Sequence, residues 1–165
     1  GPRMLKITAR HGNGCFGPQL IPQHYKEWLH KLRHIAREVG RNPDEITPAH
    51  LPFTSISDDH DTALKWLEPH VKWFLVWASQ PPSSLPQMLG YKERWKREED
   101  VPQEAIEKCF IVGTPEECVK KINEFVSSGV RYFVLAIRAP DKKGYFQSLK
   151  LYAEEVLPHF KENKG

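Results

Sequence analysis

The chain has 165 residues, of which 39% are hydrophobic and 27% are charged, and its net charge at pH 7 is +3. This balance is typical of a folded domain with a hydrophobic core and excludes a disordered chain. The 24 basic residues are interleaved with 21 acidic ones, which disfavours a nucleic-acid-binding surface. No apolar run is long enough to span a bilayer and no signal-peptide pattern opens the chain, so we expect a cytoplasmic protein with no membrane partner.

Cysteine usage supports the same compartment. The chain has Cys15, Cys109 and Cys118, an odd number without a CxxC pair. This pattern favours a reducing environment and disfavours both a disulfide framework and a zinc site. His30 and His34 are four residues apart on a predicted helix but lack the Glu of HExxH, so we expect no metal site there either.

Helical and strand-like segments alternate along the first half of the chain. The pattern predicts a helix over Pro2–His11, a short strand at Cys15–Phe16, a helix over 22–39 and a strand near Leu51–Ile56. Apolar residues at i, i+3, i+4 and i+7 make the second helix the clearest of these. Prolines 48 and 52 remove ladder donors, so we place the regular part of the strand after residue 50.

Residues 79–101 interrupt this alternation. A helix capped by residues 57–59 precedes the segment, which then reads as a proline-rich loop and a charged helix over Met88–Glu99. Long irregular segments in compact domains are often functional, so we predict an insertion or lid here. Beyond it the pattern predicts a helix over 102–108, a helix with a Thr114–Glu117 capping box, an apolar strand over Val130–Ile137 covered on both faces, and a last helix over 145–161.

Alternation of this kind predicts parallel βαβ units in an α/β fold. Three strands cannot close a (β/α)8 barrel, which takes about 250 residues. We therefore expect residues 1–165 to be a single partial barrel domain. Its missing strands would come from a second copy of the chain or from an N-terminal half of the same protein.

Several motifs resemble one family in the right order. They are Gly1-Pro2-Arg3-Met4-Leu5, residues 40–46 (GRNPDEI), residues 56–59 (ISDD), residues 111–117 (IVGTPEE) and residues 154–158 (EEVLP). Together they resemble the luciferase-like flavin and deazaflavin oxidoreductases, and most closely the group around the coenzyme F420-dependent methylenetetrahydromethanopterin reductases. The resemblance implies the C-terminal part of a TIM-like barrel, with strands six to eight at Cys15–Phe16, Leu51–Ile56 and Val130–Ile137. It also implies that the opening Gly-Pro is native and not the remnant of a cleaved tag.

The resemblance suggests where ligands bind. It implies that the phosphate of coenzyme F420, or of FMN as the alternative, docks at Gly1, Pro2, Arg3 and Met4, because a helix amino end attracts anions. The simpler interpretation is a plain helix start with an exposed arginine. Substrate contacts are expected from Tyr91, Arg94 and Trp95 in the insertion and from Arg138 at a strand end, against the alternatives of a surface helix and a solvated arginine.

No catalytic dyad can be argued from spacing, and hydride transfer does not need one because the cofactor carries the chemistry. The resemblance therefore predicts an F420-dependent oxidoreductase that moves hydride between reduced deazaflavin and an organic substrate, possibly a pterin. Two alternatives remain open. One is an FMN-dependent monooxygenase of the same fold, and the other is a non-catalytic half-barrel that oligomerises.

Overall fold

The computed structural model describes residues 2–17, 21–81, 83 and 85–161. The chain forms two compact units, each built from two stretches of sequence. Unit 1 comprises Gly1–Pro52 and Lys121–Ala136, and unit 2 comprises Phe53–Lys120 and Ile137–Gly165. The organisation of residues 1–165 as one partial barrel domain therefore stays a prediction.

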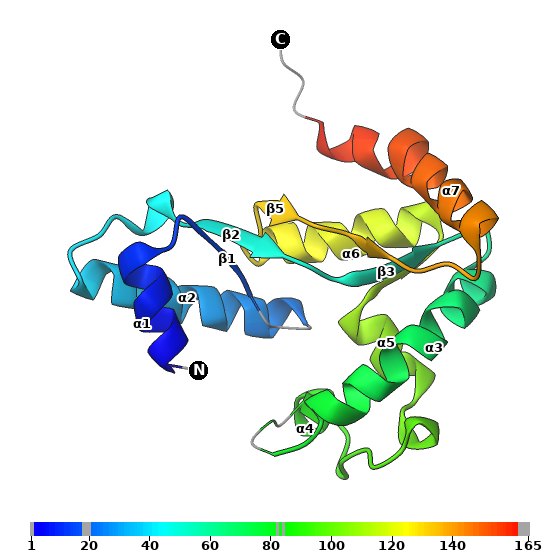
Figure 1. Cartoon of the computed structure of the whole chain (residues 1–165), viewed down its shortest axis with the longest axis horizontal. Coiled ribbons are helices and arrows are strands. Elements are labelled where there is room, and N and C mark those ends of the chain that lie inside the picture. Colours follow the sequence, from blue (N-terminus) through cyan, green and yellow to red (C-terminus); the bar gives the residue numbers. More distant parts are fainter. Residues whose placement is uncertain (1, 18–20, 82, 84, 162–165) are drawn as a thin grey trace. The chain divides into compact units, whose positions relative to one another are not determined.

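Unit 1 is a small parallel sheet with helices against it (Figure 1). Its elements are α1 (Pro2–His11), β1 (Gly14–Phe16), α2 (Pro22–Glu38), the 3-10 turn η1 (Pro43–Glu45), β2 (Thr47–His50) and β5 (Tyr132–Phe133). The strands lie in the order β1-β2-β5, and both pairs are parallel. Because α1 runs antiparallel to β1, the amino end of α1 lies at the same end of the unit as the carboxyl end of β1. The predicted bounds of α1 are confirmed.

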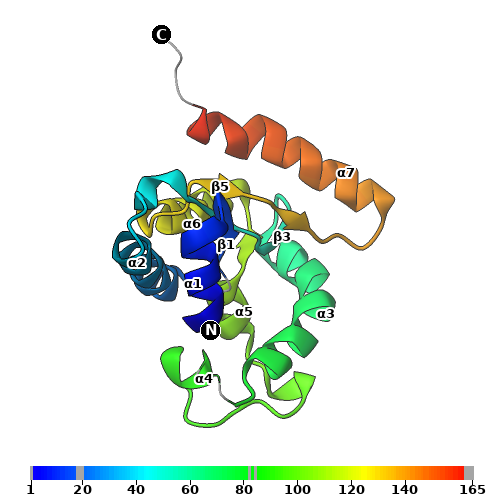
Figure 2. The ribbon, with the colours of Figure 1, turned by 60° about the vertical axis from the view of Figure 1, so that its left-hand side comes forward.

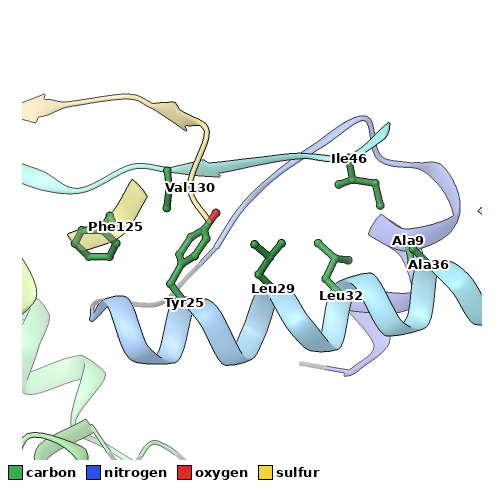
Figure 3. Close-up of a cluster of buried hydrophobic side chains, with 8 residues drawn as sticks. All are labelled: Ala9, Tyr25, Leu29, Leu32, Ala36, Ile46, Phe125 and Val130. Atoms are coloured by element: carbon green, nitrogen blue, oxygen red, sulfur yellow. The ribbon is translucent and has the colours of Figure 1, made fainter. Parts of the chain in front are cut away.

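The core of unit 1 lies between α2 and one face of this sheet (Figure 3). Figure 3 shows Tyr25, Leu29 and Leu32 pointing from α2 toward the strands. The Tyr25 hydroxyl donates a hydrogen bond to the backbone carbonyl of Ala49 at 2.9 Å, which satisfies its one polar atom in the core. The cluster comprises Ala9, Tyr25, Leu29, Leu32, Ala36, Ile46, Phe125 and Val130. The helical periodicity read from the sequence is thus confirmed as the buried stripe of α2.

Unit 2 contains a second sheet, with helices against it (Figure 2). Its elements are β3 (Phe53–Ile56), α3 (His60–Ala78), α4 (Leu85–Met88), η2 (Glu98–Asp100), α5 (Gln103–Cys109), β4 (Ile111–Gly113), the start of α6 (Pro115–Ser127), the end of β6 (Ala136–Ile137), α7 (Lys142–Leu151), the π-helical turn η3 (Tyr152–Val156) and η4 (Leu157–Phe160). The strand order is β4-β3-β6. Both α3 and α7 pack against β3, below and above it in Figure 2.

Two strand predictions need correction. The strand expected at Leu51–Ile56 begins at Phe53, as β3, whereas β2 (Thr47–His50) lies before residue 50, where the prolines led us to expect no regular strand. Pro48 is tolerated because only its N–H is missing, and its carbonyl still accepts a hydrogen bond from the Arg131 amide at 2.9 Å. The strand expected at Val130–Ile137 consists of β5 and β6. The expectation that it is covered on both faces is wrong, because Tyr132 is exposed.

β4 was not predicted as a strand. It is only three residues long, and its partner is β3, with Thr54, Ser55 and Ile56 in register with Ile111, Val112 and Gly113. A run this short carries no periodicity of its own. β4 is a strand because its backbone pairs with that of β3, more than fifty residues earlier in the sequence.

Two helix predictions need correction. The charged helix expected over Met88–Glu99 is absent, since helix α4 ends at Met88 and residues 89–97 form turns and irregular backbone. The last helix begins at Lys142, capped by the Asp141 side chain, and its expected apolar stripe is only partly buried, because Phe146, Leu149 and Leu157 are exposed. Among the described residues, no helix is both long and apolar enough to cross a membrane.

Candidate functional site

The amino end of α1 has the features of an anion site. Pro2, Arg3 and Met4 are exposed, and the first turn of this ten-residue helix contains no acidic residue. The first N–H groups of a helix have no partner within it and carry the positive end of its dipole. Gly1, which the sequence also placed in this site, lies outside the described residues.

Arg41 holds the other end of α1. Its Nη1 donates to the carbonyls of Gly12 at 2.7 Å and Ala9 at 3.4 Å, and its Nη2 donates to the Asn13 side-chain oxygen at 3.0 Å. The carbonyls at a helix carboxyl end lack partners within the helix, so a guanidinium there satisfies them and complements the dipole. Arg41 therefore fixes the position of α1 in unit 1. The sequence placed it only in a turn, because these acceptors are about thirty residues away.

The donors at the amino end of α1 fit a phosphate. A phosphate oxygen requires N–H donors and positive charge, and the first turn of α1 contains both free amides and a cationic residue, Arg3. No carboxylate in that turn opposes an anion. The residues present therefore fit the phosphate that F420 and FMN both carry.

In unit 2, the carboxyl ends of two strands lie side by side, since Ile56 and Gly113 are in register in the parallel β3–β4 pair. A helix begins just beyond each strand. Asp59 caps α3 by accepting from the Thr62 amide at 2.8 Å. At the start of α6, Glu117 accepts from the Thr114 amide at 2.8 Å and Thr114 accepts in return at 3.4 Å, so the predicted capping box is confirmed.

His60 joins these two helix starts. Its Nδ1 lies 2.9 Å from Glu117 Oε2 and its Nε2 lies 3.6 Å from Glu107 Oε1. The hydrogen bond with Glu117 raises the pKa of His60, against a smaller opposing effect of burial. Burial pushes the pKa of Glu117 upward, but its hydrogen bonds with His60 and Thr114 outweigh that effect and lower it. The arrangement favours a protonated imidazole at the strand ends, where α/β enzymes place their chemistry.

The insertion residues predicted for substrate line one cavity. It has a volume of about 470 Å³ and is bordered by Tyr91, Lys92, Glu93, Arg94, Trp95, Lys96 and Asp100. Trp95 is buried, and its ring lies 5.5 Å from that of Tyr91. Arg94 Nη1 donates to the backbone carbonyls of Ser79 and Ser83, so this guanidinium also fixes the path of the insertion. The structure thus brings Tyr91, Arg94 and Trp95 together.

Arg138 is not among the residues bordering that cavity. Its guanidinium lies over the ring of Phe53, 4.8 Å from the centroid, and Nη1 donates to the Ile137 carbonyl at 3.2 Å. A cation over an aromatic face is attracted by the ring quadrupole. Arg138 therefore has a defined position directly after β6, as the sequence suggested for a strand-end residue.

Metal ligation finds no support in the described part of the chain. No three His, Cys, Asp or Glu side chains within it gather as a possible metal site. Cys109 and Cys118 are buried, and burial raises the pKa of the Cys118 thiol to about 12. A thiol with that pKa stays protonated at neutral pH, so Cys118 does not supply a nucleophile.

Parallel strands alternating with helices, with charged groups at the strand ends, are features of α/β enzymes, (β/α)-barrel enzymes among them. The sequence matches the family described as luciferase-like monooxygenase over residues 1–132. The chain therefore belongs to this family, whose characterised relatives are flavin- or F420-dependent oxidoreductases. The family resemblance seen in the sequence motifs is confirmed.

Individual relatives agree with this assignment. The 5,10-methylenetetrahydromethanopterin reductase of Methanopyrus kandleri is 27% identical over 98% of this chain and 49% of its own length. The phthiodiolone/phenolphthiodiolone dimycocerosates ketoreductase of Mycobacterium tuberculosis is 25% identical over 100% of this chain and 48% of its own. The chain thus spans about half the length of the curated relatives it matches.

Solved structures give the same picture. The coenzyme F420-dependent tetrahydromethanopterin reductase of Methanopyrus kandleri superimposes with a TM-score of 0.80 at 26% identity, covering 98% of this chain and 49% of that one. A type II Baeyer–Villiger monooxygenase from Pseudomonas putida in complex with FMN shares the fold with a TM-score of 0.66 at 17% identity, over 93% of this chain and 44% of its own. The predicted fold class, the C-terminal part of a TIM-like barrel, is confirmed.

Proposed function

We propose that the chain is the C-terminal part of an F420-dependent oxidoreductase that transfers hydride between reduced deazaflavin and an organic substrate. The observation that carries the proposal is the likeness, over nearly the whole chain, to an F420-dependent reductase. The exposed amino end of α1 supports it, because its donors suit a cofactor phosphate. The relatives' length supports completion of the barrel by an N-terminal half, with a second copy of the chain as the other possible source of strands.

The chemistry would be divided between cofactor and protein. When bound, the deazaflavin supplies the hydride-carrying carbon, and the protein supplies binding, orientation and electrostatics. The α1 amides and Arg3 would hold the phosphate, with Pro2 opening the helix and Met4 in its first turn, and Gly1 is proposed for the same site from the sequence alone. The cavity bordered by Tyr91, Arg94 and Trp95 receives the organic substrate, for which a pterin is one candidate, and Arg138 is the candidate partner for an anionic group on it.

Titration of the chain with F420 and with FMN tests the cofactor, using the ligands' own fluorescence. Arg3→Glu places a negative charge at the phosphate site, and we expect it to weaken binding about 10-fold or more. Arg10→Glu is the matched control, because Arg10 is also exposed but lies in the last turn of the same helix. Equal weakening by both variants would show only a general charge effect. Failure of both cofactors to bind would remove the proposal that this 165-residue chain holds the cofactor phosphate by itself.

An FMN-dependent monooxygenase is the second candidate. It is favoured by the likeness to an FMN-bound monooxygenase structure of the same fold. The two candidate functions predict different cofactor preferences, because an F420-dependent enzyme binds F420 more tightly and an FMN-dependent enzyme binds FMN more tightly. A dissociation constant at least tenfold lower for FMN than for F420 would select the monooxygenase.

A further inference from the structure

A row of basic side chains follows one flank of α2. Four of them recur at intervals of three or four residues, so they lie one above the other along the helix. They are Lys26, His30, Arg33 and Arg37. All are exposed except Arg33, which is half-buried. At 1.5 Å per residue the row is about 16 Å long, and we refer to these four residues as the basic row.

The basic row has no counter-ions of its own. Within the described part of the chain, none of its four side chains forms an ion pair or a printed side-chain hydrogen bond to a carboxylate. The two acidic residues of α2 have other partners, since Glu27 accepts from Gln23 at 2.9 Å and Glu38 Oε1 lies 3.4 Å from His34 Nε2. Like charges one turn apart on a helix repel each other. An anion lying along the row would remove that repulsion.

Arg33 shows most directly that an acceptor is needed. Its Nε is buried and has no hydrogen-bond partner among the described residues. Buried polar groups without a partner are rare in proteins, because leaving one unpaired is costly. A half-buried guanidinium normally meets a carboxylate or a phosphate, whose geometry matches its donors. The acceptor for Arg33 therefore has to come from a binding partner.

The charge of unit 1 has the same sign as the row. Counted over the sequence, unit 1 has ten Lys or Arg and five Asp or Glu, which gives a net charge of +5. Unit 2 has 14 and 16 of these residues, which gives a net charge of −2. The small net charge of the whole chain thus conceals one basic unit. A surface field of one sign favours association with partners of the opposite sign.

The basic row stays accessible in a completed barrel. The buried stripe of α2 packs onto the sheet of unit 1 (Figure 3). On its two sides α2 packs against α1 and against the part of α6 that carries Phe125, whose ring lies 6.4 Å from that of Tyr25. A barrel helix contacts the sheet and the helices beside it, and all of these belong to this chain. Helices supplied by an N-terminal half would therefore contact other elements.

An acidic protein segment fits the row better than a nucleic acid does. Carboxylates one turn apart on an acidic helix have the same spacing as the four basic side chains, so each can meet one of them. Single-stranded nucleic acid sites place aromatic rings among the cations for bases to stack on, and the row contains no such ring. A duplex needs a broad basic surface, whereas Glu27 and Glu38 are exposed on the same helix.

We propose that the basic row is a docking site for an acidic segment of a partner protein. Carboxylates of that segment pair with Lys26 and Arg37, and one of them accepts from the Arg33 guanidinium at the centre of the row. The interaction is separate from hydride transfer, and it does not depend on which cofactor the protein uses.

A fluorescein-labelled oligoglutamate peptide is the probe, and its fluorescence anisotropy measures binding to the purified chain. We expect saturable binding that weakens as salt is raised, because salt screens exposed ion pairs. Arg33→Glu should weaken binding about 10-fold or more. Lys26→Glu and Arg37→Glu should weaken it less, because neither residue has a buried donor without an acceptor. Arg33→Lys keeps the charge but loses the planar fork, so its affinity should be intermediate.

Lys31→Glu is the matched control. Lys31 is exposed on the other flank of α2, and the variant changes the net charge by the same amount as Arg33→Glu. It should leave the affinity for the peptide nearly unchanged. Arg3→Glu, at the amino end of α1, should do the same. Circular dichroism and thermal midpoints verify that each variant is folded.

Four results would overturn the docking site. Equal weakening by Arg33→Glu and Lys31→Glu would show only a general charge effect. Loss of binding in Arg3→Glu would locate the peptide at α1. An oligodeoxythymidylate of equal charge that binds more tightly and displaces the peptide would assign the row to nucleic acid. Absence of peptide binding at low salt is the fourth. None of these results affects the F420 and FMN titrations, so the proposed function stands or falls separately.

Discussion

His50 stacks on Phe125 in unit 1, with ring centroids 4.3 Å apart and ring planes 30° apart. The imidazole is only 2% exposed, and neither ring nitrogen has a hydrogen-bond partner among the described residues. Burial lowers the pKa of His50 from its ordinary 6.5 to about 4, with a smaller opposing effect of the Gly17 backbone. His50 is therefore neutral in the folded chain at neutral pH, where it serves as one ring of an aromatic cluster.

Acid should destabilise the chain through His50. The unfolded chain takes up this proton near pH 6.5 and the folded chain only near pH 4, so stability is lost as pH falls between these values. The full loss is about 3 kcal/mol. His50→Phe keeps the stacking and should remove this part of the pH dependence. Urea unfolding at pH 7 and pH 4.5 measures it, with the exposed His34→Gln as control. Equal acid sensitivity of wild type and His50→Phe would contradict the prediction.

Thr54 and Tyr152 should depend on each other for stability. Their hydroxyls form a buried hydrogen bond between β3 and η3, and the Tyr152 hydroxyl also contacts Cys118 Sγ at 3.8 Å. Tyr152→Phe leaves the Thr54 hydroxyl without this partner and should cost about 1–2 kcal/mol. Adding Thr54→Val should recover part of that loss, because both polar groups are then gone. Additive effects in a double-mutant cycle, within about 0.5 kcal/mol, would show that the two hydroxyls do not interact in solution.

Gly129 should tolerate substitution less well than Gly40. Both have positive φ, +108° and +75°. A Cβ on Gly129 would lie 2.5 Å from Leu29 Cδ2, whereas a Cβ on Gly40 meets no atom within 4 Å. Gly40→Ala should therefore cost about 1 kcal/mol from backbone strain, and Gly129→Ala should cost about 1–3 kcal/mol more from overpacking. Thermal unfolding of the two variants measures the difference. Equal midpoints would mean that the Leu29 side chain moves aside freely.

Arg94 should hold the insertion together, whereas Arg97 should not. Arg94 donates to two backbone carbonyls, while the Arg97 side chain is 74% exposed and pairs with the nearby Glu99 and Asp100. Arg94→Met leaves the carbonyls of Ser79 and Ser83 without this donor, so residues 79–101 should open more often. Limited proteolysis should then cut this segment several-fold faster than in wild type. Arg97→Met is the matched control and should change the cleavage rate little.

Local signals in the sequence were sufficient for much of the fold. The bounds of α1 follow from Pro2 at its start and the glycines after it, and the start of α6 follows from the Thr114–Glu117 box. The apolar stripe of α2 predicted its buried residues. These features depend on residues within about four positions of each other, so a sequence reading can find them.

The wrong predictions concern segments whose conformation depends on contacts with residues far away in the sequence. A charged run with helical composition was read as a helix over Met88–Glu99. In the structure, Trp95 is buried there and Arg94 bonds to carbonyls eleven and fifteen residues earlier, contacts that irregular backbone makes. The candidate site shows the same limit. Tyr91, Arg94 and Trp95 follow from the composition of one segment. The pair of His60 with Glu117 and the hydrogen bond from Arg41 to the Gly12 carbonyl join residues far apart in the sequence, and no local pattern predicts them.

The sequence by itself determined the family and the places of helices α1, α2 and α6, because each depends on short motifs. Only the tertiary structure decided which strands pair, that neither His50 ring nitrogen has a hydrogen-bond partner among the described residues, and that Phe16 and Tyr132 lie on either side of Ala49. Those three relationships join residues from 33 to 116 positions apart. Parallel pairing and core packing bring such residues together, and no local pattern encodes that.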